Sequence, residues 1–181
     1  MRKQYGVTLT ELLITIAIVA ILVTVVVPSV RDLIIQQRII AELNELSGLV
    51  QLARSQAIDQ HVSITLCPSK DHSRCSSNWN HGKILFNDAD GNRVRSESEE
   101  LLHAVKHISK YNLLSGPKNN IVFRQAGDIA SPATLLLCDK DNNAEFARAL
   151  TISLQGRVKL SQDTNNDGIY EDNAGNALEC T

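Results

Sequence analysis

Residues 12–27 read LLITIAIVAILVTVVV, a run without any charged residue that decides the first part of the fold. With residues 7–11 added, the span is 21 residues long. As a helix it would measure about 31 Å, which matches the hydrocarbon core of a bilayer. No Gly or Pro interrupts the run before Pro28. We therefore expect a membrane-spanning helix over residues 7–28.

The residues around this span bear on its type and orientation. Arg2 and Lys3 precede it and favour a cytoplasmic N-terminus, although Arg31 and Arg38 follow closely, so charge alone decides orientation weakly. A secretory signal peptide would end at a small-residue cleavage site, whereas this run ends in three valines and a proline. A plain anchor fits better but leaves Glu11 unexplained, because an intramembrane carboxylate costs about 2.5 kcal/mol or more unless it is paired or lies among headgroups.

The segment Gly6-Val7-Thr8-Leu9-Thr10-Glu11-Leu12-Leu13-Ile14 resembles the cleavage site of type IV prepilins and type II secretion pseudopilins. The resemblance implies that residues 1–6 are a leader and that a prepilin peptidase cuts after Gly6. Val7 would then be the new N-terminus, where the family usually has Phe. Glu11 becomes the fifth mature residue, the family's acidic position, and Pro28 matches the family's helix-bending Pro.

This arrangement gives the acidic residue a physical role. Cleavage exposes a positive amine at Val7, and Glu11 of one subunit can neutralise the amine of its neighbour as helices stack. An otherwise unpaired charge in the membrane would thus set the register of assembly. Residue type, spacing and apolar run agree, so we favour a pilin-like protein over an unrelated anchor.

After Pro28 the pattern predicts an amphipathic helix over residues 29–58. Its apolar residues recur every three or four positions: Ile35, Ile39, Leu43, Leu46, Val50, Ala53 and Ala57. One helix from Val7 to about Ile58 would be roughly 78 Å long. The same spacing suits a coiled coil, but the two alanines favour close packing on a sheet.

From residue 59 to 181 the sequence predicts a strand-rich head. Short runs with a period of two are separated by Gly, Pro and Asp turns, and they cover residues 62–66, 83–87, 101–107, 120–124, 133–138, 150–154 and 157–160. One long helix followed by such strands indicates an α+β fold with an antiparallel sheet packed on the helix.

This region resembles the GspH/FimT family of minor pilins and minor pseudopilins. The matching pieces are residues 51–57, the strand that ends in Cys67-Pro68-Ser69, and Trp79-Asn80-His81-Gly82-Lys83-Ile84-Leu85-Phe86-Asn87-Asp88, with weaker matches at residues 156–159 and 167–168. The resemblance covers most of the chain and implies a type IV pilin-like fold.

All four cysteines follow the apolar span. If the N-terminus is cytoplasmic, they lie in an oxidising compartment and should form disulfides. Three connectivities are possible, and we favour Cys67–Cys75, which closes a short polar loop, with Cys138–Cys180, which ties down the C-terminal tail. Zinc binding is the alternative, but no tight Cys-x2-Cys pair is present.

The sequence offers few candidate sites. Asp163, Asn165 and Asp167 match the start of a calcium loop, but its twelfth position is Ala174, so a polar turn is favoured. Asp88-x-Asp90-x-Asn92 has Arg93 where such a loop needs Gly, and we interpret it as a hairpin turn. No nucleophile, phosphate-loop or dinucleotide motif is visible, so we expect a protein that is not an enzyme and has no cofactor.

DNA binding is the main rival function. Some FimT-like minor pilins bind DNA through a Gly-Arg-x-Arg element, which residues 156–159, Gly-Arg-Val-Lys, resemble. Arg157 and Lys159 would point the same way in a strand, with Arg148 one strand away. The formal net charge of -2 and the small aromatic content of 4% do not support nucleic-acid binding, and a solvated strand face is favoured.

We therefore predict a minor pilin of a type IV pilus, held in the bacterial inner membrane with a periplasmic head and then incorporated near the pilus tip. The resemblance implies a prepilin peptidase, other minor pilins and the major pilin as partners. A minor pseudopilin of type II secretion is the alternative assignment within the family. A FimT-like minor pilin that binds DNA for natural transformation is the alternative function.

Overall fold

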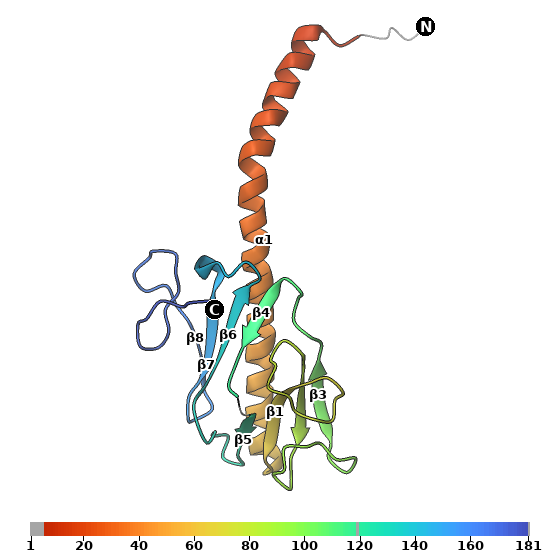
Figure 1. Ribbon diagram of the computed structural model, residues 1–181, viewed down its shortest axis with the longest axis vertical. Coiled ribbons are helices and arrows are strands. Elements are labelled where there is room, and N and C mark those ends of the chain that lie inside the picture. The colour runs from red at the N-terminus through yellow and green to blue at the C-terminus, as the bar shows by residue number, and fades with distance from the viewer. Residues whose placement is uncertain (1–5, 119, 181) are drawn as a thin grey trace. The chain divides into compact units, whose positions relative to one another are not determined.

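The computed structural model in Figure 1 describes residues 6–118 and 120–180, without the side chains of residues 25, 27 and 28. Its helix α1 covers Leu9–Gln60, so the predicted bounds of 7 and 58 each differ by two residues. The helix starts after Thr8, whose Oγ1 accepts a hydrogen bond from the backbone N–H of Glu11 (3.3 Å). This contact is an N-cap, which satisfies one of the free donors of the first turn.

The chain divides into two units, Met1–Gln37 and Arg38–Thr181. In the first unit most of the described large apolar side chains are exposed, from 78% at Leu9 to 44% at Val30, and Ile35 is half-buried. The helix is long and apolar enough to cross a membrane. Its hydroxyls are satisfied internally, because Thr15 donates to the carbonyl of Leu12 and Thr24 to those of Ala20 and Ile21. Such back-bonding suits a helix in a medium that offers no hydrogen bonds.

The second unit contains two four-stranded antiparallel sheets where the sequence predicted one. The first has the order β3-β2-β1-β5, with β1 Ile64–Ser69, β2 Gly82–Asn87, β3 Leu101–Val105 and β5 Ile121–Phe123. The second has the order β4-β6-β7-β8, with β4 Asn112–Ser115, β6 Ala133–Asp139, β7 Arg148–Ile152 and β8 Val158–Leu160. The predicted α+β class is confirmed, while β4 and the short 3-10 helix η1 (Ala144–Phe146) were not predicted.

The core of this unit forms where both sheets lie along the C-terminal part of α1 (Figure 1). The predicted apolar stripe of the helix is buried there, from Ile39 to Ala57, and Leu49 is buried with it. Val50, Ala53 and Ala57 have no exposed surface, so the small side chains allow close packing on the strands, as predicted. Burial of apolar surface is the main stabilising contribution here.

Polar contacts tie α1 to the start of β4. The Glu42 carboxylate accepts hydrogen bonds from the backbone N–H of Ser109 (2.6 Å) and from Nδ2 of Asn112 (2.7 Å). Arg38 Nε donates to Oδ1 of the same Asn112 (2.9 Å). Asn112 is itself buried, so this network also satisfies a polar side chain that would otherwise destabilise the core.

Lys83 of β2 is a buried cation, with 1% of its surface exposed. Burial lowers the pKa of its ammonium from 10.5 to about 8, and the attraction of Glu42 and Glu45 opposes this shift. In the unfolded chain the ordinary pKa applies, so between about pH 8 and 10.5 the unfolded state holds more protons than the folded one. The free energy of unfolding therefore rises with pH across this window.

We expect Lys83→Met to remove this part of the pH dependence and to stabilise the protein at pH 7 by up to about 3 kcal/mol, since a pKa unit corresponds to about 1.4 kcal/mol. Urea unfolding of the detergent-solubilised chain at pH 7 to 10 measures the effect. Lys106→Met replaces an exposed lysine and is the control. Its free energy of unfolding should change with pH as that of the wild type does. If the free energy of unfolding of Lys83→Met rises with pH as steeply as that of the wild type, the buried Lys83 is not the cause of this pH dependence.

Candidate functional site

The residues around the predicted cleavage point are open to a partner. Gly6 and Val7 precede α1, and Val7 is 71% exposed. A Cβ added at Gly6 would meet nothing within 4 Å, so the fold itself does not require glycine there. Residues 1–5, which make up most of the predicted leader, lie outside the described residues. If glycine is required at position 6, the requirement therefore comes from a processing enzyme and not from the fold.

Glu11 lies in the first turn of α1 and is exposed. It is the single charged residue between Val7 and Val30. Its backbone N–H donates to Thr8, whereas its carboxylate forms no hydrogen bond or ion pair with the residues that the structure describes and is available to a neighbouring subunit. A negative charge here also interacts favourably with the positive end of the helix dipole. Pro28, the other predicted assembly residue, lies inside α1.

Both predicted disulfides are present in the head. Cys67 pairs with Cys75, with Cα atoms 5.5 Å apart, and Cys138 pairs with Cys180, with Cα atoms 5.9 Å apart. The first closes the loop after β1. The second attaches the C-terminal tail to β6, where Leu178 and Ala147 pack around it. Disulfides of this kind are typical of extracytoplasmic proteins.

The three basic residues predicted as a DNA-binding set do not form one surface. Arg157 and Lys159 are exposed, but Arg148 is buried, with 8% of its surface accessible. Its guanidinium lies 3.4 Å from the centre of the Tyr170 ring and donates to the carbonyls of Glu145 and Ala147. The expectation that Arg148 lies beside the other two as a phosphate ligand is therefore corrected: it holds the tail against β7.

The glycine of the Gly-Arg-Val-Lys element has a structural explanation. Gly156 lies in a tight turn with φ +70°, in which its N–H donates to the carbonyl of Ser153 (2.8 Å). A Cβ at this position would lie 2.1 Å from the carbonyl oxygen of Gly127. The side chain of Arg54 on α1 also donates to that carbonyl and to Gln155, so the turn is fixed against the helix.

We expect Gly156→Ala to destabilise the protein by about 2 kcal/mol or more, because a left-handed alanine is strained and the clash with Gly127 is with backbone. Thermal unfolding of the detergent-solubilised chain measures the loss. Gly175→Ala is the matched control, since Gly175 has φ +86° but nothing within 4 Å of its added Cβ. Equal losses in both variants would show that the contact with Gly127 has no effect.

The C-terminal tail forms the polar loop predicted from Asp163, Asn165 and Asp167. Asp163 accepts hydrogen bonds from the N–H groups of Asn166 and Gly168, and Asp167 accepts from that of Ile169. Carboxylate oxygens of Asp163, Asp167 and the buried Glu171 lie within 4.8 Å of one another. Glu171 was not predicted. Its Oε2 accepts hydrogen bonds from the N–H and the hydroxyl of Thr164, which favours a structural polar turn over a calcium site.

The segment that begins with Asp88 was predicted as a hairpin turn. It does connect the antiparallel strands β2 and β3, but as a long loop of residues 88–100. The loop brings Glu99 back to Asp88 and Asp90. Glu99 was not predicted, although its spacing of eleven residues from Asp88 is a signal in the sequence.

An exposed apolar helix with one acidic residue in its first turn, followed by a disulfide-linked α+β head, defines a type IV pilin-like protein. The chain belongs to the GspH family. The model of this family, described as type II transport protein GspH, matches residues 42–156. A second model, the prokaryotic N-terminal methylation motif, matches residues 1–27, which contain Gly6 and Glu11. The protein is therefore a minor pilin or minor pseudopilin.

Solved structures show the same fold. The type IV minor pilin FimU of Pseudomonas aeruginosa is 20% identical, and the alignment covers 72% of this chain and 90% of FimU with a TM-score of 0.51. The minor pseudopilin EpsH from the type II secretion system of Vibrio cholerae is 10% identical, with 69% and 94% covered and a TM-score of 0.52. At these identities the likeness concerns the fold alone. No curated protein sequence matches the chain.

Proposed function

We propose that this chain is a minor pilin of a type IV pilus, a structural subunit and not an enzyme. A prepilin peptidase removes residues 1–6, and residues 7–28 hold the protein in the inner membrane. Residues 29–58 carry the helix into the periplasmic head of residues 59–181. The subunit then enters the filament beside other minor pilins and the major pilin, in the complex that primes assembly and stays near the tip.

One observation supports the proposal that this chain assembles into a filament: Glu11 is the single charge in an apolar segment of more than twenty residues and is the fifth residue of the chain that cleavage would create. An isolated carboxylate in lipid is unfavourable. The amine of a neighbouring subunit at Val7 removes that penalty once helices bundle. Membrane insertion alone would gain nothing from an acid at this position.

The oxidised head supports the proposed orientation. Both disulfides lie in the second unit, so this part of the chain suits the periplasm, and the basic residues before the span suit the cytoplasm. DNA binding is not part of the proposal. Arg157 and Lys159 alone would neutralise about two phosphates, too few for strong binding at physiological salt.

Deletion of the gene tests the proposal, with sheared surface pili and secreted proteins measured in the same cells. We expect loss of surface pili, secretion unchanged, and an antibody against the head that labels filament ends in complemented cells. Normal piliation with defective secretion would contradict the pilus assignment and show a pseudopilin. Labelling along the whole filament would contradict the position near the tip.

A further inference from the structure

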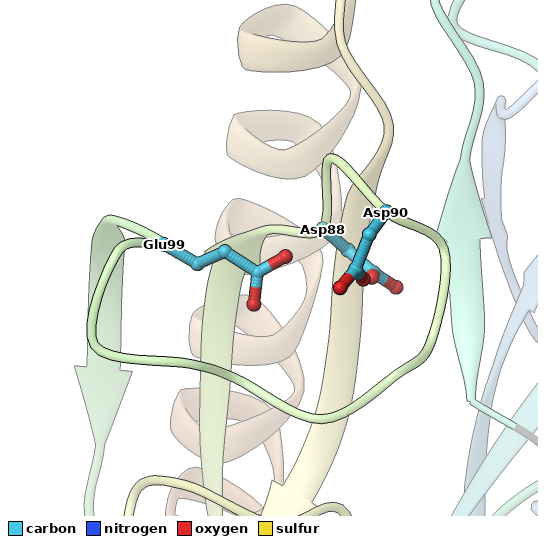
Figure 2. Close-up of side chains that lie close together, drawn as sticks. All are labelled: Asp88, Asp90 and Glu99. Carbon is cyan, nitrogen blue, oxygen red and sulfur yellow. The ribbon is translucent and has the colours of Figure 1, made fainter.

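The β2–β3 loop, Asp88–Glu99, gathers three carboxylates at one point. Asp88 and Asp90 follow the end of β2, and Glu99 precedes β3. One carboxylate oxygen from each lies within 4.8 Å of the other two. Asp88 is 1% exposed and Glu99 7%, whereas Asp90 is at the surface. Figure 2 shows the Glu99 side chain reaching across the loop toward the two aspartates.

The hydrogen bonds of the loop do not account for all of this negative charge. Asp88 accepts from the hydroxyl of Thr65 (2.7 Å) and from the N–H of Arg93 (3.3 Å). Glu99 uses only Oε2, which accepts from the N–H and the hydroxyl of Ser96. Its Oε1 accepts no hydrogen bond from the residues that the structure describes and stays accessible to solvent, although the residue as a whole is only 7% exposed and its side chain points toward the two aspartates.

No lysine or arginine forms a salt bridge with these three carboxylates within residues 6–118 and 120–180. Buried charges in proteins are paired or bind metal ions. The second acidic cluster differs in this respect, because Asp163 attracts the guanidinium of Arg148. Among the residues that the structure describes, the loop between β2 and β3 thus gathers negative charge without a salt bridge to a lysine or arginine.

The oxygen spacing fits a calcium ion. Ca²⁺ binds oxygen ligands at about 2.3–2.6 Å, so oxygens on opposite sides of the ion lie about 5 Å apart. Oxygens that all lie within 4.8 Å of one another can share one such ion. Mg²⁺ needs shorter contacts in a strict octahedron and keeps more of its water, so a protein loop rich in carboxylates suits it less.

The residue order gives an independent indication. Asp88, Asp90, Asn92 and Glu99 occupy the first, third, fifth and twelfth positions of a twelve-residue calcium loop, in which the last residue is a Glu. The sixth position of such a loop is normally Gly. Here it is Arg93, which nevertheless adopts the left-handed conformation with φ +64°.

We propose that the Asp88–Glu99 loop binds one Ca²⁺ ion through the carboxylates of Asp88, Asp90 and Glu99. Asn92 and the carbonyl of Val94, at the fifth and seventh positions, are the further oxygen donors that this order supplies. The ion would join the end of β2 to the start of β3 and so stabilise the edge of the first sheet. This proposal does not depend on which filament the protein enters.

Calorimetric titration of the full-length, detergent-solubilised protein with CaCl₂, after treatment with EDTA, tests it. We expect one site with a Kd of about 10⁻⁴–10⁻³ M, in the range of extracellular calcium modules, and a melting temperature that rises with Ca²⁺. Asp90→Asn and Glu99→Gln should each weaken binding by about tenfold or more, since each removes one ionised ligand. Asp90 is exposed, so its variant tests the site even if Glu99→Gln does not fold.

Two controls locate the ion. Glu97→Gln changes an exposed carboxylate of the same loop and should bind Ca²⁺ as the wild type does. Asp167→Asn changes the tail cluster and should also leave the titration unchanged. The proposal is wrong if the wild type takes up no Ca²⁺, if Mg²⁺ binds equally well, or if Asp167→Asn abolishes binding while Asp90→Asn retains it.

Discussion

Gly6→Phe leaves the protein at its precursor mass. The proposed processing step requires the peptidase to bring its reacting groups close to the peptide bond after residue 6, and a bulky side chain there blocks that approach. A loss of cleavage in this variant would not be explained by misfolding, because a Cβ at Gly6 meets nothing within 4 Å. Intact mass spectrometry of the membrane fraction distinguishes the full chain from the chain that begins at Val7.

Val7→Phe is the matched control for this prediction. It places the same bulky ring one residue further on, at the position where the pilin family itself usually has Phe, so we expect normal cleavage. A Gly6→Phe protein with the mature mass would show that cleavage before Val7 does not require glycine at position 6. It would contradict the proposed processing by a prepilin peptidase and favour an unrelated membrane anchor.

The sequence predicts the helix well because apolar spacing is a local property. The stripe from Ile39 to Ala57 is buried as expected, and α1 ends within two residues of the prediction. The division of the strands into two sheets depends on pairing between distant segments, which no local pattern contains. β4 was missed for the same reason: its residues are few, and contacts with β6 and with Glu42 on α1 hold them in place.

The candidate sites were likewise predicted where the signal is local in the sequence and missed where it depends on contacts between distant segments. Gly6 and Glu11 are recognised from the sequence because their spacing along one segment is the signal. Arg148 was misplaced, since its burial under Tyr170 depends on a tail that a disulfide brings back to β6. Glu99 was missed because its importance depends on a loop that returns it to Asp88.

Replacing Glu11 tests the proposed pairing with the least disturbance of the helix. The N-cap uses the backbone N–H of residue 11, which every substitution except Pro retains. Glu11→Gln keeps the shape of the side chain and removes only its charge. The loss of favourable interaction with the helix dipole is about 0.3–1 kcal/mol, too little to unfold a helix of this length.

The amount of this subunit in sheared filaments, relative to its amount in the membrane, is the measurement that tests the central claim most directly. We predict that Glu11→Gln lowers this ratio by about tenfold or more, because it leaves the neighbour's amine unpaired in an apolar bundle. Glu11→Asp, which keeps the charge, should retain a substantial part of incorporation, and Glu97→Gln at an exposed position in the head should behave as the wild type. Incorporation of Glu11→Gln at the wild-type ratio would contradict the claim that this carboxylate directs assembly.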